Sequence, residues 1–368
     1  MTFFLISGEA SGDKHAAGLV RALRARDAGA RFAGTGGEAM RKEGVYLYQD
    51  YREMAYMGIV AVLKNLGKVR RNFRLVEQAL LKERPDVLVL VDYPSFNLRM
   101  AAFCRRHLPA TRIVYYIPPK VWAWKRWRVH RIARLTDAVL GIFPFEPAFY
   151  ARYGYTCHYA GNPTAEEVRH HLTTDIKLCD RPFIAVLPGS RRSEIEHCLP
   201  TMLMAARQAA PQYETVVVAA PGQPDDIYRK AFNGMQGVRL VAGDTFTVLR
   251  QAEAAIVNSG TATLEAVLTG CPQVAVYHIA LPHAVKISGL LFSSKYFTLP
   301  NILLQKEVIK EMIGYRFTVD GVATELRNIL AGSPARERQL ADYDNIRSML
   351  GDSDASANAA EAIMALKQ

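Results

Sequence analysis

Cysteines and long apolar runs are scarce in this 368-residue chain, and each scarcity excludes a class of protein. The five cysteines are dispersed and form no Cys-x-x-Cys pair, which argues against a disulfide scaffold. No stretch reaches the roughly 18 apolar residues of a membrane-spanning helix. The N-terminal residues also lack the basic start of a signal peptide. We therefore expect a cytoplasmic protein with free thiols.

Other chemistries are excluded by missing motifs. There is no Gly-x-Ser-x-Gly elbow, no Walker loop and no dinucleotide Gly-x-Gly-x-x-Gly. His170 and His171 are adjacent in sequence, and the other histidines are isolated, so no metal-ligand cluster is evident. We accordingly predict neither a metal nor a cofactor. Hydrophobic residues make up 50% and charged residues 22%, which excludes disorder over the bulk of the chain.

Acidic residues are absent from one long window. Between Asp92 and Asp137 there is no Asp or Glu, whereas ten Lys and Arg residues fall there. All three tryptophans, Trp122, Trp124 and Trp127, lie in the same window. The whole chain has a net charge of +11. We expect an anionic partner: a phosphorylated substrate, a membrane surface or a nucleic acid.

Three interpretations fit this window and a second basic cluster, which follows the apolar run at 57–63. Solvated helix faces beside ordinary core aromatics would produce the pattern. An anionic lipid surface would place tryptophans at the headgroups and cations on the phosphates. Single-stranded nucleic acid would use the same mixture. The residues predicted to meet a lipid surface are Met57, Ile59, Val60, Trp122, Trp124, Lys125, Arg126, Trp127 and Arg128.

Short apolar runs alternate with longer helical patterns, which predicts an α/β fold with parallel sheets. The runs fall at 3–7, 31–34, 86–91, 111–117 and 138–143, and again at 183–187, 214–220, 238–241, 254–257 and 273–277. A break near 163–182 separates the two series. We predict two doubly wound, Rossmann-like domains facing one another across a cleft. Their bounds are 1–165 and 180–335, and a helical tail over 336–368 packs on an N-terminal domain.

Two loops of the first domain carry candidate chemistry, because ligands in such sheets sit at the carboxyl ends of strands. The glycines of 7–13 allow a tight turn, and Ser11 and Asp13 are placed to cap the following helix. Asp92 follows a buried strand directly, where a carboxylate can serve as a general base. The alternatives are a plain capped turn in the first loop and a turn-forming Asp before Pro94 in the second.

Two further loops lie in the second domain. At 187–194 a strand turns at Gly189, and free N–H groups at the next helix start, with Ser190 and Arg191, would cradle a diphosphate. At 258–265 a small-residue turn again leads into a helix, whose N-terminus can face the same phosphates. Glu265 would accept from sugar hydroxyls, unless it only complements the helix dipole.

These motifs, in this order, resemble the lipid-A-disaccharide synthase family, which are inverting glycosyltransferases of the GT-B type. The resemblance runs from about Phe4 to Leu330 and rests on several independent segments. They are SGEASGD (7–13), GTGGEAM (34–40), MGIVAVL (57–63), DYPSFN (92–97), PPKVWAWKRWRV (118–129), FPFEPAFY (143–150), LPGSRRSEI (187–195), NSGTATLEAVLTGCP (258–272) and TLPNILL (298–304).

The resemblance implies a reaction and a place. UDP-2,3-diacylglucosamine would donate its sugar to 2,3-diacylglucosamine 1-phosphate, giving a β-1,6-linked disaccharide 1-phosphate and UDP. The enzyme would work without a metal, peripherally on the cytoplasmic face of the inner membrane and against its anionic lipids. It would not bind nucleic acid. A homodimer is compatible with the family, with the C-terminal helices exchanged.

The resemblance also implies roles for single residues. The catalytic residues would be Asp92 as general base and Arg191 opposite the departing UDP. Acceptor contacts would come from Glu9, Ser11, Asp13 and Asn97. The nucleotide sugar would be held by Gly189, Ser190, Arg191, Ser259, Gly260, Thr261, Glu265 and Asn301.

The chain departs from the family pattern at three positions, which are Ser95, Asn162 and Gly314. Ser95 stands where the family often has a second Asp, so Asp92 is the sole acid of its loop. Two other functions remain alternatives. One is a different GT-B enzyme that uses a UDP-sugar, such as an epimerase or a transferase with a soluble acceptor. The other is a basic nucleic-acid-binding protein, although both phosphate-cradling turns lie in the less basic half.

Overall fold

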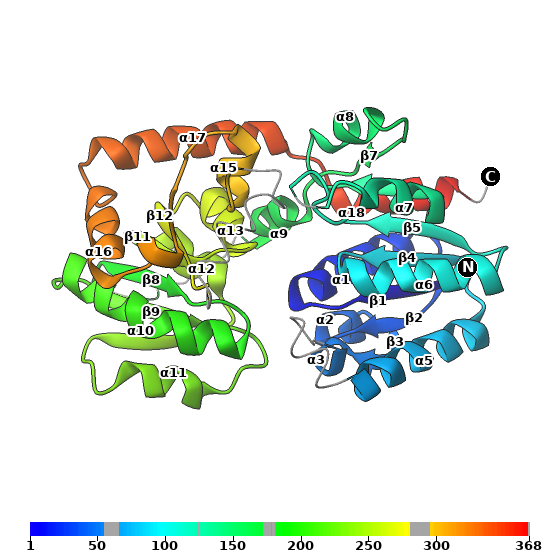
Figure 1. Ribbon diagram of the computed structural model, residues 1–368, viewed down its shortest axis with the longest axis horizontal. Coiled ribbons are helices and arrows are strands. Elements are labelled where there is room, and N and C mark those ends of the chain that lie inside the picture. Colours follow the sequence, from blue (N-terminus) through cyan, green and yellow to red (C-terminus); the bar gives the residue numbers. More distant parts are fainter. Residues whose placement is uncertain (55–65, 124, 172–177, 179–180, 280–294, 367–368) are drawn as a thin grey trace. The chain divides into compact units, whose positions relative to one another are not determined.

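The computed structural model describes the chain except for residues 55–65, 124, 172–177, 179–180, 280–294 and 367–368 (Figure 1). The chain forms two compact units. Unit 1 comprises Met1–Pro163 and Asp352–Gln368, and unit 2 comprises Thr164–Gly351. The chain therefore leaves unit 1 once and returns to it at its end.

Unit 1 is built on a parallel sheet of seven strands. The strands are β1 (Thr2–Ser7), β2 (Arg31–Gly36), β3 (Tyr46–Asp50), β4 (Val87–Val91), β5 (Arg112–Tyr116), β6 (Ala138–Gly141) and β7 (His158–Tyr159). They lie in the order β3-β2-β1-β4-β5-β6-β7. The helices of this unit are α1 (Ala10–Arg26), α2 (Glu38–Lys42), α3 (Tyr51–Met54), α5 (Leu66–Glu83), α6 (Pro94–His107), α7 (Arg128–Leu135), α8 (Glu146–Ala151) and α18 (Ala355–Ala365).

The sheet of unit 1 is buried on both faces, because successive side chains of a strand point to opposite sides. In β1, Phe4 and Ile6 join the core formed with α5, α6 and α7. Phe3 and Leu5 join the core on the other face, with α1 and α18. All four side chains are fully buried. This double burial explains why the strands read as continuous apolar runs.

Unit 2 repeats the architecture with six parallel strands in the order β10-β9-β8-β11-β12-β13. The strands are β8 (Phe183–Leu187), β9 (Glu214–Ala219), β10 (Val238–Ala242), β11 (Ala254–Asn258), β12 (Gln273–Tyr277) and β13 (Lys310–Ile313). The helices are α10 (Arg192–Ala209), α11 (Asp225–Phe232), α12 (Thr245–Gln251), α13 (Ala262–Thr269), α15 (Leu299–Leu304), α16 (Val319–Asn328) and α17 (Pro334–Leu350), with η1 (Gly314–Arg316). Helix α9 (Pro163–His171) begins at the boundary between the units.

The C-terminal tail is shared between the units. Helix α17 belongs to unit 2, where Oε1 of Gln339 accepts from the backbone N–H of Gln273 at 2.7 Å. Helix α18 belongs to unit 1 and buries Ala359, Ala360 and Ile363 in the core that α1 also lines. The two helices of the expected tail therefore complete different cores.

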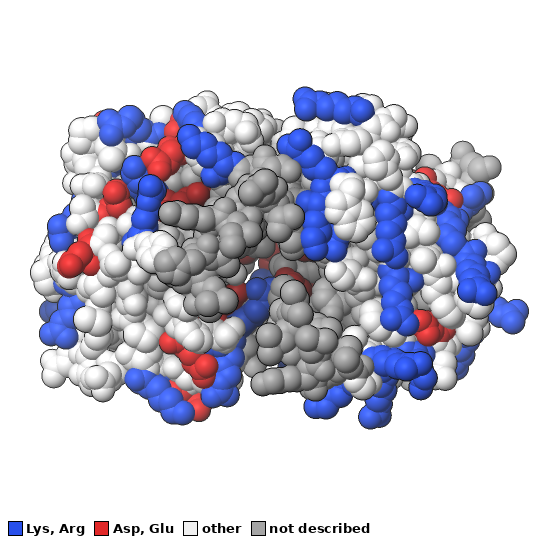
Figure 2. Space-filling model, in the orientation of Figure 1, with Lys and Arg blue, Asp and Glu red and all other residues white. Residues whose placement is uncertain are grey.

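Charge is divided unequally between the units. Unit 1 holds 27 Lys and Arg against 16 Asp and Glu, whereas unit 2 holds 19 of each. The whole net charge of +11 therefore belongs to unit 1. In Figure 2, the visible face of unit 1 carries many Lys and Arg and few acids, while both signs mix over unit 2. Any long-range attraction of anions by the net charge therefore comes from unit 1.

Candidate active site

Each sheet reverses its strand order at one point, and the loops singled out from the sequence lie there. In unit 1, loops 7–13 and 92–97 follow β1 and β4, the two strands at the reversal. In unit 2, loops 188–194 and 259–265 follow β8 and β11. Open parallel sheets bind ligands outside the carboxyl ends of the strands at such reversals. The topology thus places all four loops at the ligand-binding position of their unit.

Asp92 sits in strained backbone at the end of β4. Its φ is +46° and that of Tyr93 is +43°, a region that residues other than glycine rarely adopt. The Asp92 carbonyl accepts from the Asn97 amide and from the Tyr115 hydroxyl, both at 2.7 Å. The Asp92 amide donates to the Ile117 carbonyl at 3.2 Å. Three neighbours therefore hold the backbone of the half-buried Asp92 in a conformation that costs energy, as is common at functional sites.

The Asn97 side chain bonds to the backbone of this loop. It is fully buried, and its amide nitrogen also donates to the Val91 carbonyl at 3.2 Å. One side chain thus closes the turn between the last residue of β4 and Asp92. The predicted contact of Asn97 with the acceptor remains a prediction. The geometry assigns Asn97 the positioning of Asp92.

The loop after β1 packs against the loop after β4. A Cβ on Gly8 would lie 2.3 Å from the Tyr93 ring, so only glycine fits there. The Tyr93 hydroxyl donates to the Met54 carbonyl at 2.9 Å. Burial, and then the charge of Glu9, raise the pKa of Tyr93. Glu9 and Ser11 are half-buried here, beside the loop that carries Asp92.

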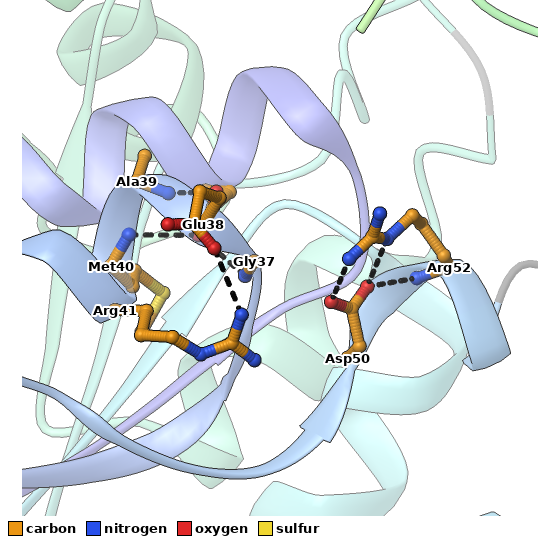
Figure 3. A network of polar contacts seen from close by, with 8 residues as sticks. Gly37, Glu38, Ala39, Met40, Arg41, Asp50 and Arg52 are labelled. Atoms are coloured by element: carbon orange, nitrogen blue, oxygen red, sulfur yellow. Dashed lines mark hydrogen bonds and ion pairs between the residues drawn. The ribbon is translucent and has the colours of Figure 1, made fainter. Parts of the chain in front are cut away.

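Asp13 has a different role from the one predicted. Helix α1 begins at Ala10, so Ser11 and Asp13 lie within its first turn and the predicted capping of α1 by them is wrong. The buried Asp13 carboxylate instead accepts from the backbone amides of Gly37, Ala39 and Met40, at 2.6, 3.0 and 3.2 Å. Figure 3 labels these three donor residues at the start of α2. Asp13 caps α2, where a negative charge also complements the helix dipole. An acceptor contact would compete with these three bonds.

The turn after β8 holds an internal carboxylate. Glu194 Oε2 accepts from the amides of Ser190 and Arg191, at 3.1 and 3.3 Å. Glu194 Oε1 accepts from the Arg191 guanidinium at 2.8 Å. The expectation of free N–H groups at this helix start is therefore wrong for these two amides. Glu194 was missed as a site residue, although an acid at the third position of a helix is a known signal for capping.

The turns after β8 and β11 lie together. Gly189 has a φ of +110°, and a Cβ there would lie 2.4 Å from Glu194 Oε2 and 2.6 Å from Asn258 Nδ2. Gly260, in contrast, is exposed, and a Cβ there would meet nothing within 4 Å. Of the two glycines, one is thus demanded by packing and the other borders open space, where a ligand could approach the backbone.

The other residues predicted near the nucleotide in this part of unit 2 come from the same turn after β11 and from the start of α13. Ser259 donates its amide to the Val276 carbonyl at 2.8 Å, and Thr261 precedes α13, with Glu265 in the first turn. Gln223 was not predicted, but its amide donates to the Ser190 carbonyl at 3.0 Å. The sequence holds no signal for it, because Gln223 comes from the loop after another strand.

Asn301 is a scaffold residue in this geometry. It is fully buried, and its amide donates to the Ile309 carbonyl and to the Glu311 carboxylate, at 2.9 and 3.0 Å. Its oxygen accepts from the amides of Val308 and Ile309, at 2.8 and 2.9 Å. These four bonds use the usual capacity of an asparagine amide, so a direct nucleotide contact would have to replace one.

The predicted membrane surface loses one member. Trp122 is buried, and its indole donates to Glu146 Oε1 at 3.1 Å, so it presents no ring to a lipid surface. Trp127 is 60% exposed, and Arg126 is exposed beside it. Lys125 and Arg128 are half-buried. Met57, Ile59, Val60 and Trp124 lie outside the described residues.

Within the described part of the chain, no helix is long and apolar enough to cross a membrane. The described residues also contain no group of three or more His, Cys, Asp and Glu that could hold a metal ion. The departure at Asn162 has a structural role, because its amide donates to the Ile142 carbonyl at 3.2 Å.

A family model described as lipid-A-disaccharide synthetase matches residues 3–365. The lipid-A-disaccharide synthase of Myxococcus xanthus is 37% identical, over 98% of this chain and 96% of its own length. That of Pseudomonas putida is 35% identical, over 98% and 97%. The chain belongs to the lipid-A-disaccharide synthase family. This membership confirms the predicted glycosyltransferase of lipid A biosynthesis.

Solved structures resemble the fold of this synthase family member at low identity. The UDP-GlcNAc 2-epimerase of Neisseria meningitidis, bound to UDP-GlcNAc, gives a TM-score of 0.69 at 11% identity, with all of both chains covered. The calicheamicin glycosyltransferase CalG4 gives 0.59 at 16% identity, over 99% of this chain and 97% of its own. The predicted GT-B class, with two doubly wound parallel sheets and a helical tail, is confirmed.

Proposed function

We propose that this chain transfers 2,3-diacylglucosamine from UDP-2,3-diacylglucosamine to 2,3-diacylglucosamine 1-phosphate. The products are the β-1,6-linked disaccharide 1-phosphate and UDP. The match to lipid-A-disaccharide synthases over nearly the full chain is the observation that supports this most strongly. The position of Asp92, at the strand-order reversal of unit 1 and in strained backbone, supports its use as the base.

In the proposed reaction, Asp92 accepts the proton of the acceptor 6-hydroxyl. The freed oxygen forms a bond to the anomeric carbon of the donor sugar. The bond between that carbon and the diphosphate oxygen breaks, and its electron pair leaves with UDP. Attack from the face opposite UDP converts an α-linked donor into a β-linked product. General base catalysis of this kind contributes about 10²- to 10⁴-fold to a rate.

Unit 2 supplies the proposed donor site. The guanidinium of Arg191 would balance the charge that develops on UDP, and the turn at 189–191 would hold the diphosphate. Glu194 now occupies the amides of Ser190 and Arg191. A diphosphate at these amides would therefore displace the Glu194 carboxylate or bind beside it.

We also propose that the enzyme works at the anionic inner-membrane surface, facing the cytoplasm. The excess of cations in unit 1 and the exposed ring of Trp127 support this placement. Both substrates carry acyl chains, so a lipid surface is where they would be found.

The test uses purified protein with both lipid substrates in neutral detergent, followed by UDP release and lipid product analysis. Asp92→Asn is the decisive variant, and Asp86→Asn is its matched control. Asp86 stands just before the same strand at the opposite end, where it accepts from the Thr2 amide at 2.7 Å. We expect disaccharide from the wild type and the control, and at least a 100-fold lower kcat from Asp92→Asn.

Each other outcome has a distinct meaning. Disaccharide formation at an unchanged rate by Asp92→Asn would keep the function and remove Asp92 as base. UDP release without a disaccharide would indicate an epimerase or hydrolase. Absence of both turnover and UDP binding in the wild type would refute the transferase.

A further inference from the structure

One guanidinium beside the Asp92 loop is held without an acidic partner. Arg128 is the first residue of α7, and its Nη2 donates to the Ser95 hydroxyl at 3.5 Å. Its guanidinium also lies 5.7 Å from the centre of the Trp127 ring. No carboxylate among the described residues forms an ion pair with Arg128. Arg105, also in unit 1, pairs with Asp137 at 2.7 Å.

The electrostatic surroundings of Arg128 are positive. Burial lowers the pKa of Arg128, Tyr115 opposes this shift, and Arg131 adds a smaller lowering. Burial, and then Arg128 itself, lower the pKa of Lys125. Like charges held together at partial burial disfavour the charged forms, and a bound anion would relieve both effects.

Backbone strain gathers at the same place. Among the described residues, seven other than glycine have a positive φ. Four of them are Asp92, Tyr93, Ile117 and Lys125, which follow β4 and β5. The bond from the Asp92 amide to the Ile117 carbonyl ties two of these segments together. Such strain persists where the surroundings impose it, and it concentrates at ligand sites.

Tyr115 lies close to both Arg128 and the proposed base, Asp92. Its buried hydroxyl donates to the Asp92 carbonyl, and its ionisation responds to the charges of both the Asp92 carboxylate and the Arg128 guanidinium. Ser95, the partner of Arg128, lies three residues after Asp92 in the same loop. A ligand that touches Arg128 and Ser95 would therefore lie beside the carboxylate that takes the proton.

We propose that Arg128 and the Ser95 hydroxyl bind the phosphate monoester of the acceptor sugar, with Lys125 adding to the positive field. This role rests on the proposed function and deepens it, because it assigns the acceptor phosphate to named residues. A guanidinium can donate two parallel hydrogen bonds to phosphate, and the hydroxyl can donate a third. The phosphate would anchor the sugar while Asp92 reaches its 6-hydroxyl.

The experiment compares two acceptors in neutral detergent. One is 2,3-diacylglucosamine 1-phosphate, and the other is the same lipid with a free 1-hydroxyl. Arg128→Gln is measured beside Arg134→Gln, which removes one charge from an exposed position of the same helix. We expect kcat/KM of Arg128→Gln to fall about 10- to 100-fold with the phosphorylated acceptor only, the range for a hydrogen bond to a charged group. Arg134→Gln should stay within twofold with both acceptors.

Two further variants separate the roles of charge and geometry. Arg128→Lys keeps the charge but loses the planar fork, so it should recover part of the phosphate-dependent rate. Ser95→Ala should lose about threefold with the phosphorylated acceptor only, the lower range for one hydrogen bond. The KM for UDP-sugar should not change in any of these variants. Thermal unfolding of each variant checks that the fold is intact.

The outcomes that overturn the phosphate site are specific. Equal losses with both acceptors, or no loss, would refute it while the transferase stands. Equal loss of binding to anionic vesicles by Arg128→Gln and Arg134→Gln, without acceptor selectivity, would assign Arg128 to lipid headgroups instead. If the wild type forms no disaccharide, the proposed function fails. The phosphate site is then decided by binding of glucosamine 1-phosphate, which Arg128→Gln must weaken and Arg134→Gln must not.

Discussion

The two units share one architecture, but the cations beside their candidate ligand-binding turns differ in whether they form ion pairs. In unit 1 the turn after β4 is built from residues other than glycine, and a cation beside it has no acidic partner among the described residues. In unit 2 the turn after β8 contains glycine, and its cations are paired: Arg191 with Glu194 and Arg192 with Glu196. The cations beside the two turns therefore differ in pairing: Arg128 has no ion pair among the described residues, whereas Arg191 and Arg192 each pair with a nearby Glu.

The largest expected effect comes from substituting one of two neighbouring arginines in unit 2, Arg191 and Arg192. Arg191→Ala should lower kcat about 100- to 1,000-fold, because a group that stabilises charge in the transition state is lost. Arg192→Ala should stay within twofold, since Arg192 pairs with Glu196 on an exposed helix surface. Steady-state kinetics with both lipid substrates decides. Comparable losses in both variants would show that general charge matters rather than the position of Arg191.

The next effect compares the two glycines of unit 2. Gly189→Ala should lower the free energy of unfolding by about 2–3 kcal/mol, because its φ is strained for alanine and Glu194 and Asn258 leave no room. Gly260→Ala should change stability by less than about 0.5 kcal/mol. Its Cβ meets nothing within 4 Å, so it should raise the KM for UDP-sugar only if a ligand approaches there. Urea unfolding measures the first difference, and equal stability of the two variants would contradict it.

Unit 1 should also show a pH dependence of stability that has its origin in one buried carboxyl. Burial raises the pKa of Glu146 from 4.5 to about 7, against hydrogen bonds from Phe143, Trp122 and Ile142. Between these values the folded protein keeps the proton and the unfolded chain releases it. The free energy of unfolding should therefore fall by up to about 3 kcal/mol as pH rises from 4.5 to 7. Unfolding measured across this range should lose that slope in Glu146→Gln, and an unchanged slope would assign it to other groups.

The smallest expected effect comes from removing the negative charge of Glu194, which pairs with Arg191 in unit 2. Glu194→Gln keeps the shape of the side chain and eliminates its negative charge beside the proposed diphosphate site. We expect the Kd of UDP to fall about three- to tenfold, because the ligand no longer meets a carboxylate at the amides of Ser190 and Arg191. Calorimetric titration with UDP measures this. A weaker affinity would instead mean that the charge of Glu194 holds Arg191 in its binding position.

The sequence predicts interior strands better than edge strands. All ten apolar runs are strands, and nine of them are interior strands, which are buried on both faces of a parallel sheet. The tenth, β10, is an edge strand, and the other three edge strands, β3, β7 and β13, were not predicted. Tyr46 in β3 is 63% exposed, so the strand lacks a continuous apolar pattern. Burial, rather than pairing, is what leaves a trace in the sequence.

At the candidate site, the sequence predicted which loops carry the residues but not which side chains and amides those residues bond to. Asp13 bonds to amides 24 to 27 residues away, and Trp122 bonds to Glu146, 24 residues away. Those partners depend on the register between distant segments, which no local motif encodes. Glu194, in contrast, lies only three residues from Arg191. Its bond to Arg191 could be foreseen from capping chemistry alone.

The return of the chain to unit 1 sets an order on folding during synthesis. Helix α18 covers a face of α1 in the core of unit 1, although all of unit 2 lies between these two helices in the chain. Every residue of unit 2 precedes α18, so unit 2 can close its core while the chain is still being made. Unit 1 cannot, because one apolar face of α1 stays uncovered until α18, which follows unit 2 in the chain, has been made.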